Sequence, residues 1–257
     1  MGLHVNAARR QQKAVDAISD YGGWIRYDYQ YPSGAFSLQD FDPQAGSPVP
    51  AWLLERFGVD MFHDVVQVNL YYSEDSGKRE VNDNQADEAI VWLPDFPKLR
   101  VLLLQGNQIT DESMENLAAL RYLEYLMMWD AHAVSDDGTA HLRDLKHLKF
   151  ILLSKAKITD RSLEMFAKMP QLEGLSLQFN AFSDAGVSKL SDLHNLTSLF
   201  VCGAQGHRNP ITDASLVFLS RLPKLTDLGV QNTEVTANGV DEFKRSLPGR
   251  QVESNVK

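Results

Sequence analysis

The sequence predicts an α/β solenoid, a curved stack of strand–helix units, from three observations. Of the 33 leucines, 28 lie in residues 93–257. There the spacing L-x-x-L-x-L opens six successive segments, at intervals of 24 to 29 residues. Each opening is followed by apolar residues at helical spacing, and a single unit cannot bury this face alone. Stacked units bury it together, with a parallel sheet on the concave face and helices on the convex face.

Each repeat predicts one strand followed by one helix. The alternating apolar positions of the opening indicate a short strand with one buried face. In the first complete unit, Met114, Leu117 and Leu120 then follow at helical spacing. The six openings are Leu99-Leu102-Leu104, Leu123-Leu126-Met128, Leu148-Ile151-Leu153, Leu172-Leu175-Leu177, Leu196-Leu199-Val201 and Leu225-Leu228-Val230. A degenerate earlier copy at Val65-Val68-Leu70 brings the expected number of repeats to about seven.

The flanking segments predict caps for the two ends of the solenoid. Residues 1–64 are expected to form an N-terminal α/β cap, and residues 65–247 the solenoid, interrupted by an acidic insertion at 71–95. Residues 248–257 are expected to form a C-terminal cap and tail. Within the N-terminal cap we expect a helix over 7–21, a strand over 24–29, a long loop over 31–50 and a short helix over 51–58.

A short motif, an apolar residue followed by Thr or Ser and then Asp, comes after five of the predicted strands. The motifs are Ile109-Thr110-Asp111, Val134-Ser135-Asp136, Ile158-Thr159-Asp160, Phe182-Ser183-Asp184 and Ile211-Thr212-Asp213. With these motifs the chain resembles the leucine-rich-repeat superfamily over residues 65–250. The resemblance is to the ribonuclease-inhibitor-like subclass with I-T-D-x-G/S-L repeats, found in bacterial repeat families and in the cysteine-containing repeats of F-box proteins. It implies a right-handed horseshoe arc.

The first 60 residues also resemble the leader of the bacterial repeat families. The words Gly22-Gly23, Tyr27-Asp28-Tyr29 and Pro50-Ala51-Trp52-Leu53 carry this likeness. Members of those families often have a membrane anchor just upstream. The basic run from Arg9 to Lys13 has two interpretations, the stub of such an anchor and a solvated helix start. The localisation therefore stays open, with the soluble part of an anchored or exported bacterial protein as one expectation.

Aspartates recur at one phase of the repeat. An Asp at the start of a helix accepts backbone N–H bonds and complements the helix dipole, so we expect these residues to cap helices rather than catalyse a reaction. They are Asp83, Asp111, Asp136, Asp160, Asp184 and Asp213.

Composition and motifs argue against most other classes of function. A net charge of −9 disfavours nucleic-acid binding. The sequence has no stretch of 18 consecutive apolar residues, so we expect no membrane insertion by this chain itself. The single cysteine, Cys202, excludes an internal disulfide and paired-Cys zinc sites. Nucleotide, hydrolase and metalloprotease motifs are missing, and the histidines lack metal-pair spacing, so we expect no enzyme, cofactor or metal.

Two features leave an enzymatic or metal-binding alternative open. Cys202 and His207 lie close enough in sequence to meet in one loop, although a dyad also needs an orienting group and an oxyanion hole. The insertion at residues 73–95 is rich in carboxylates that are suited to calcium or a basic partner. A plain thiol and a solvated loop are the favoured interpretations.

The main functional hypothesis concerns the concave face. Residues that alternate with the inward leucines point to this face, and eight of them are large and apolar. They are Val101, Leu103, Tyr125, Met127, Trp129, Phe150, Leu152 and Phe200. Exposed apolar patches usually mark interaction sites, so we expect a non-enzymatic module that binds a protein or peptide. The alternatives are self-association through the same patch and an internal lid from residues 31–50 or 202–210.

Overall fold

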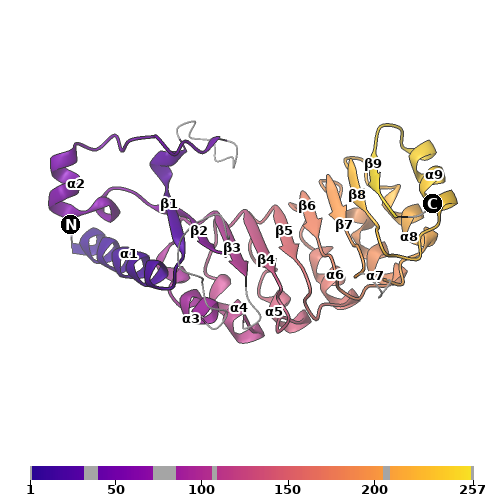
Figure 1. Ribbon diagram of the computed structural model, residues 1–257, viewed down its shortest axis with the longest axis horizontal. Helices are drawn as coiled ribbons and strands as arrows, with labels where there is room; N and C mark the ends of the chain where they lie inside the picture. Colours follow the sequence, from indigo (N-terminus) through magenta and orange to yellow (C-terminus); the bar gives the residue numbers. More distant parts are fainter. Residues whose placement is uncertain (1, 32–39, 72–84, 106–108, 205–208, 256–257) are drawn as a thin grey trace.

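A computed structural model describes residues 2–31, 40–71, 85–105, 109–204 and 209–255. Within these ranges nine strands form one sheet, in the order of the chain. Figure 1 shows a shallow arc with the strands on its concave side and the repeat helices on its convex side. The predicted solenoid is therefore confirmed. Among the described helices, none combines the length and the apolar character that a bilayer span requires.

The strands follow the predicted frame closely. They are β1 (Trp24–Tyr27), β2 (Val65–Leu70), β3 (Val101–Gln105), β4 (Tyr125–Trp129), β5 (Phe150–Leu153), β6 (Gly174–Ser176), β7 (Ser198–Phe200), β8 (Asp227–Gly229) and β9 (Gln251–Glu253). Strands β2 to β9 pair in parallel, and β1 pairs antiparallel with β2. The cap thus continues the sheet of the solenoid, and the C-terminal tail adds a further parallel strand.

The helices alternate with the strands. They are α1 (Gly2–Asp20), α2 (Ala51–Phe57), α3 (Gln85–Ile90), α4 (Asp111–Leu117), α5 (Asp136–Ala140), α6 (Asp160–Phe166), α7 (Asp184–Ser188), α8 (Asp213–Leu219) and α9 (Ala237–Ser246). Short 3-10 turns are η1 (Asp28–Gln30), η3 (Val59–Met61), η5 (Leu93–Asp95) and η6 (Lys189–Asp192). Helix α1 begins five residues before the predicted start and ends at Asp20, just before Gly22-Gly23. Gly22 has a φ angle of 80°, which favours glycine, and a side chain on Gly23 would collide with Leu70 and Ile18.

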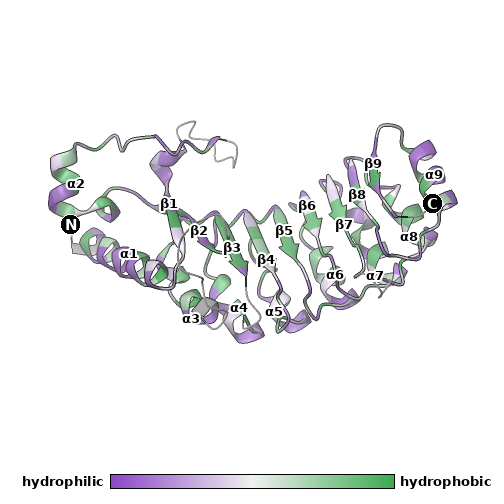
Figure 2. Ribbon diagram, in the orientation of Figure 1, coloured by the Kyte–Doolittle hydropathy of each residue, from purple (hydrophilic) through white to green (hydrophobic). Residues whose placement is uncertain are grey.

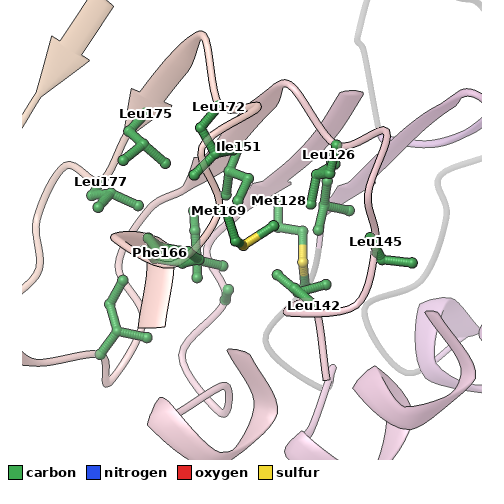
Figure 3. Close-up of a cluster of buried hydrophobic side chains, with 14 of the residues drawn as sticks. Leu126, Met128, Leu142, Leu145, Ile151, Phe166, Met169, Leu172, Leu175 and Leu177 are labelled. Carbon is green, nitrogen blue, oxygen red and sulfur yellow. The ribbon is translucent and has the colours of Figure 1, made fainter. Parts of the chain in front are cut away.

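The core lies between the sheet and the helices. Figure 2 shows hydrophobic colouring along the strands, and Figure 3 shows side chains from several repeats meeting in one cluster. Within it, Leu126 and Ile151 from the sheet and Phe166 from α6 are at most 2% exposed. Burial of each such side chain contributes about 1.5–3 kcal/mol, so the consensus leucines drive the stacking of repeats.

The aspartates of the repeats have a different role from the predicted one. The helix cap is the Thr or Ser that precedes each Asp. Thr159 Oγ1, for example, accepts the backbone N–H of Arg161 at 3.3 Å. The following Asp160 is the first helical residue, where its charge complements the helix dipole. The aspartates in the described residues are structural as expected, but their assignment as N-caps is wrong.

The aspartate carboxylates link each repeat to the next. Asp136 accepts the N–H and the hydroxyl of Thr159 at 2.9 and 2.7 Å, and the N–H of Ser162 at 3.1 Å. In alternate repeats a glycine replaces this serine. A Cβ atom on Gly186 would lie only 2.1 Å from Asp160 Oδ1, so the carboxylate fills that space. The other described members of this aspartate ladder are Asp87, Asp111, Asp184 and Asp213.

The acidic insertion is shorter than predicted. Residues 72–84, which include Asp83, lie outside the described residues. Residues 85–95 were expected in a solvated loop, but they form α3 and η5 and fully bury Ala89, Ile90 and Leu93. Asp87 accepts the hydroxyl of Ser113 and occupies the ladder position that the sequence pattern assigns to Asp83. The first repeat therefore has its own helix.

Candidate functional site

The predicted patch residues form two rows across β3, β4 and β5. The register pairs Val101 with Tyr125 and Tyr125 with Phe150. The next row pairs Leu103 with Met127 and Met127 with Leu152. Because neighbouring strands lie about 4.8 Å apart, the side chains within each row are in contact range. Trp129 ends β4 and opens a third position beside Gln105.

Exposure and position in the sheet divide the eight predicted residues into three groups. Val101 is fully buried and adds no accessible surface. Phe200 lies on β7 and is separated from Leu152 by Ser176 on β6, so it stands apart from the others. The remaining six are partly exposed and adjacent, and we call them the concave patch. These are Leu103, Tyr125, Met127, Trp129, Phe150 and Leu152.

The aromatic rings of the patch pack against the neighbouring strand. Tyr125 stacks on Phe150 with ring centroids 4.9 Å apart and planes 4° apart. The Phe150 ring in turn covers Gly174 on β6, where an added Cβ would lie 2.4 Å from Phe150 Cδ1. Phe200 covers Gly229 in the same way. These glycines were not among the predicted site residues, although each occupies a concave position next to an aromatic residue in the sequence frame.

A second aromatic contact closes the edge of the patch nearest the cap. The ring centroids of Tyr71, which follows β2, and Trp129, at the end of β4, lie 4.7 Å apart. The contact thus spans β3, whose last residue, Gln105, pairs with Trp129. Tyr71 thus joins the surface, although the prediction did not include it. Tryptophan and tyrosine are the residue types that most often dominate binding energies at interfaces.

Ion pairs between repeats flank the patch at both ends of the strands. Before β4, Glu124 accepts from Arg100 Nε at 2.6 Å and from Lys149 Nζ at 2.8 Å. The bond to Glu124 raises the pKa of Lys149. After β4, Lys155 Nζ donates to Asp130 at 2.6 Å and lowers the pKa of that carboxyl group. The charges beside the patch are thus compensated within the chain.

One exposed aromatic side chain lies just beyond the patch in a strained conformation. Phe179 follows β6, is 40% exposed and has a φ angle of 63°. Asp130, Lys155 and Asn232 occupy the left-handed region at corresponding places after β4, β5 and β8. A bulky residue is uncommon in this region, which favours Gly, Asn and Asp. The repeat pattern alone did not identify Phe179, because backbone angles are not visible in it.

The cap covers the first part of the concave face. Tyr31 is almost fully buried, and its hydroxyl donates to Gln67 Oε1 on β2 at 2.7 Å. Arg26 Nη1 donates to the same oxygen at 3.2 Å. Gln67 pairs in register with Val101, which explains why the cap side of the predicted patch is buried. Of the two candidate lids, 31–50 and 202–210, residues 32–39 and 205–208 lie outside the described residues.

The cysteine hypothesis finds no support in the described geometry. Cys202 is buried, and its Sγ atom lies 2.6 Å from Gln231 Oε1, to which the thiol donates. Burial raises the pKa of the Cys202 thiol, which disfavours the reactive thiolate. His207 lies outside the described residues. In the part of the chain that the structure describes, no three His, Cys, Asp or Glu side chains converge to hold a metal ion.

Comparisons with known proteins agree with this architecture. A family model described as leucine-rich repeat matches residues 97–118 and 169–191. The structure of internalin C2 from Listeria monocytogenes superposes with a TM-score of 0.50 at 20% identity, over 64% of this chain and 65% of that chain. A further internalin from the same organism gives a TM-score of 0.48 at 22% identity, over 65% and 50% of the two chains.

The likeness to internalin C2 concerns the fold. The chain spans about two thirds and half of the two internalin chains, respectively. No match is found among curated protein sequences. The matched repeats, the phased strands and the sheet in chain order together show that the chain has the leucine-rich-repeat fold.

Proposed function

We propose that this protein is an interaction module that binds a protein or peptide partner through its concave patch. The observation that carries the proposal is the contiguity of six partly exposed apolar side chains on β3, β4 and β5. Soluble proteins rarely expose such a group without a binding role.

The chemistry of the patch favours an apolar or aromatic segment of a protein. Trp129 and Tyr125 supply large contact areas with few rotatable bonds, and Met127 supplies an adaptable thioether. The flanking charges of Glu124 and Asp130 are already paired within the chain. We therefore expect binding to be driven by apolar burial, with a negative heat-capacity change and weak dependence on salt.

The test compares two double variants in a pull-down from the native source, followed by calorimetry with the purified partner. Met127→Asp with Trp129→Asp places two charges in the patch, and we expect the affinity to fall at least ~30-fold, since losing one hot spot costs about 2 kcal/mol. The control, Val91→Asp with Val217→Asp, changes two exposed apolar residues outside the patch. Unchanged affinity in the patch variant, or equal losses in both variants, would refute the proposal.

Self-association through the same patch is the second candidate, because a contiguous apolar surface is also suited to a second copy. Sedimentation at several concentrations separates the two functions. A monomer at all concentrations excludes self-association. A dimer that the Met127/Trp129 variant abolishes would favour it over an external partner.

A further inference from the structure

The cap contains a serine, a histidine and an aspartate in hydrogen-bonded order. His63 Nδ1 lies 2.9 Å from Asp28 Oδ1, and His63 Nε2 lies 2.7 Å from Ser47 Oγ. The three residues are far apart in the sequence. Asp28 and His63 meet because β1 pairs antiparallel with β2, which brings the end of β1 beside the start of β2, and Ser47 reaches His63 from the segment before α2.

The partners define how the protons are placed. An ionised carboxylate such as Asp28 only accepts, so the Nδ1 atom of His63 carries the proton in the neutral ring. Nε2 is then the acceptor, and the Ser47 hydroxyl donates to it. This is the arrangement in which a histidine serves as the general base for a serine nucleophile and the carboxylate orients the ring.

Neighbouring groups hold each member in place. The backbone N–H of Tyr29 donates to Asp28 Oδ1 at 2.8 Å, and the Tyr29 ring packs 4.5 Å from the His63 ring. His63 is nearly buried, and Ser47 is partly exposed. The Ser47 oxygen accepts the backbone N–H of Val49 at 3.0 Å, which limits its rotation. The base is thus shielded from water, while the serine residue keeps part of its surface exposed.

A cavity of about 330 Å³ lies beside Asp28 and His63 and reaches the residue next to Ser47. Asp28, His63 and Pro48, the residue after Ser47, contribute to its wall. Its other lining residues are Tyr29, Tyr31, Val66 and Arg100. The volume is suited to a small molecule. Arg100 also lines the cavity, and Glu124 holds its guanidinium group, with Nε donating at 2.6 Å.

We propose that Ser47, His63 and Asp28 form a nucleophilic site that cleaves small carboxylic esters. The Ser47 oxygen bonds to the ester carbonyl carbon while His63 Nε2 takes the hydroxyl proton. The C–O bond to the alcohol then breaks, and His63 returns the proton to the leaving oxygen. Water, deprotonated by His63, hydrolyses the acyl-serine and regenerates the hydroxyl group. Asp28 orients the imidazole and stabilises its protonated form.

The test uses a fluorophosphonate probe and p-nitrophenyl acetate with the full chain. In the probe reaction the Ser47 oxygen bonds to phosphorus, fluoride leaves, and His63 takes the proton. We expect labelling at Ser47, identified by peptide mass spectrometry in the native protein and lost in urea. Ser47→Ala should abolish labelling and ester cleavage, and His63→Gln should slow both by about 100-fold or more.

Controls keep the result independent of folding and of the concave patch. Ser19→Ala removes an exposed serine of α1 and should label as the wild type does. The Met127/Trp129 patch variant should also retain labelling, so failure of one proposal does not imply failure of the other. An unlabelled native protein, labelling that persists in Ser47→Ala, or labelling that is equal in urea would overturn the proposal and leave the three residues as a fastening of the cap.

Discussion

Removal of one ladder aspartate should destabilise the protein far more than removal of its neighbour. Asp136 and Asp137 are adjacent in the first turn of α5 and carry the same charge. Asp136 bonds to Thr159 and Ser162 of the next repeat, whereas Asp137 pairs only with Arg161, at 3.0 Å on the surface. The variants Asp136→Ala and Asp137→Ala therefore separate the ladder from the helix dipole, which affects both residues.

The magnitude follows from which bonds water can replace. Thr159 is exposed, so water substitutes for the lost carboxylate there. Ser162 is 1% exposed, so water does not replace its two bonds to Asp136; its hydroxyl group keeps Thr139 Oγ1 at 2.8 Å and its N–H keeps Thr159 O at 3.0 Å. At about 1.5 kcal/mol for each bond to a charged group, Asp136→Ala should cost about 3 kcal/mol. Asp137→Ala should cost less than about 1 kcal/mol, because Asp137 and Arg161 are both about 70% exposed.

Thermal unfolding followed by circular dichroism measures the difference. For a protein of this size, 3 kcal/mol corresponds to a fall in Tm of about 6–12 °C, against about 3 °C or less for Asp137→Ala. Equal falls in Tm would refute the reasoning, since only the helix dipole and the net charge are common to both positions. A large fall for Asp137→Ala alone would show that the surface ion pair outweighs the ladder.

Three further outcomes test other parts of the structure. Burial raises the pKa of Asp136 and Asp184, but hydrogen bonds from the next repeat outweigh it and hold both pKa values below the ordinary value. The stabilisation by these carboxylates is therefore present above about pH 4 and is lost as the pH falls through their folded pKa values. Urea unfolding at several pH values should show the difference in stability between the wild type and the Asn variants shrinking as the pH falls. Cys202 should react with a thiol reagent only after unfolding, and rapid reaction in the native protein would contradict its buried geometry. Phe179→Asn should raise the stability by about 1 kcal/mol, because Asn232 already adopts the same left-handed backbone, and an unchanged or lower Tm would argue against strain at this position.

The repeat frame was predictable from the sequence because it depends on periodicity. The spacing of Leu102 and Leu104 determines which face of β3 is buried, and the same rule applies to every later strand. The bonds of Asp136 to the next repeat were not predictable in this way. They depend on distances between repeats, although the alternation of Ser162 and Gly186 at the third helical position carries a trace of them.

The cap was harder to predict because its contacts are long-range and irregular. Asp28, Ser47 and His63 follow no period. The antiparallel pairing of β1 with β2 brings Asp28 to His63, and Ser47 comes from the irregular segment before α2. The burial of Val101 has the same origin. Its place in the strand frame predicts exposure, but Tyr31 closes over the adjoining Gln67 from a segment that the repeat pattern does not describe.

The later repeats show that the concave patch is not required for the sheet. At the register positions of Phe150 and Leu152, β6 carries Gly174 and Ser176, and the two strands pair in parallel without interruption. Strands β7 and β8 continue the same pairing, with Ser198 at the position after Gly174. Inward leucines and the aspartate ladder thus suffice to join repeats. Large apolar side chains on β3, β4 and β5 are an addition to this framework, which is why we assign them to binding rather than to folding.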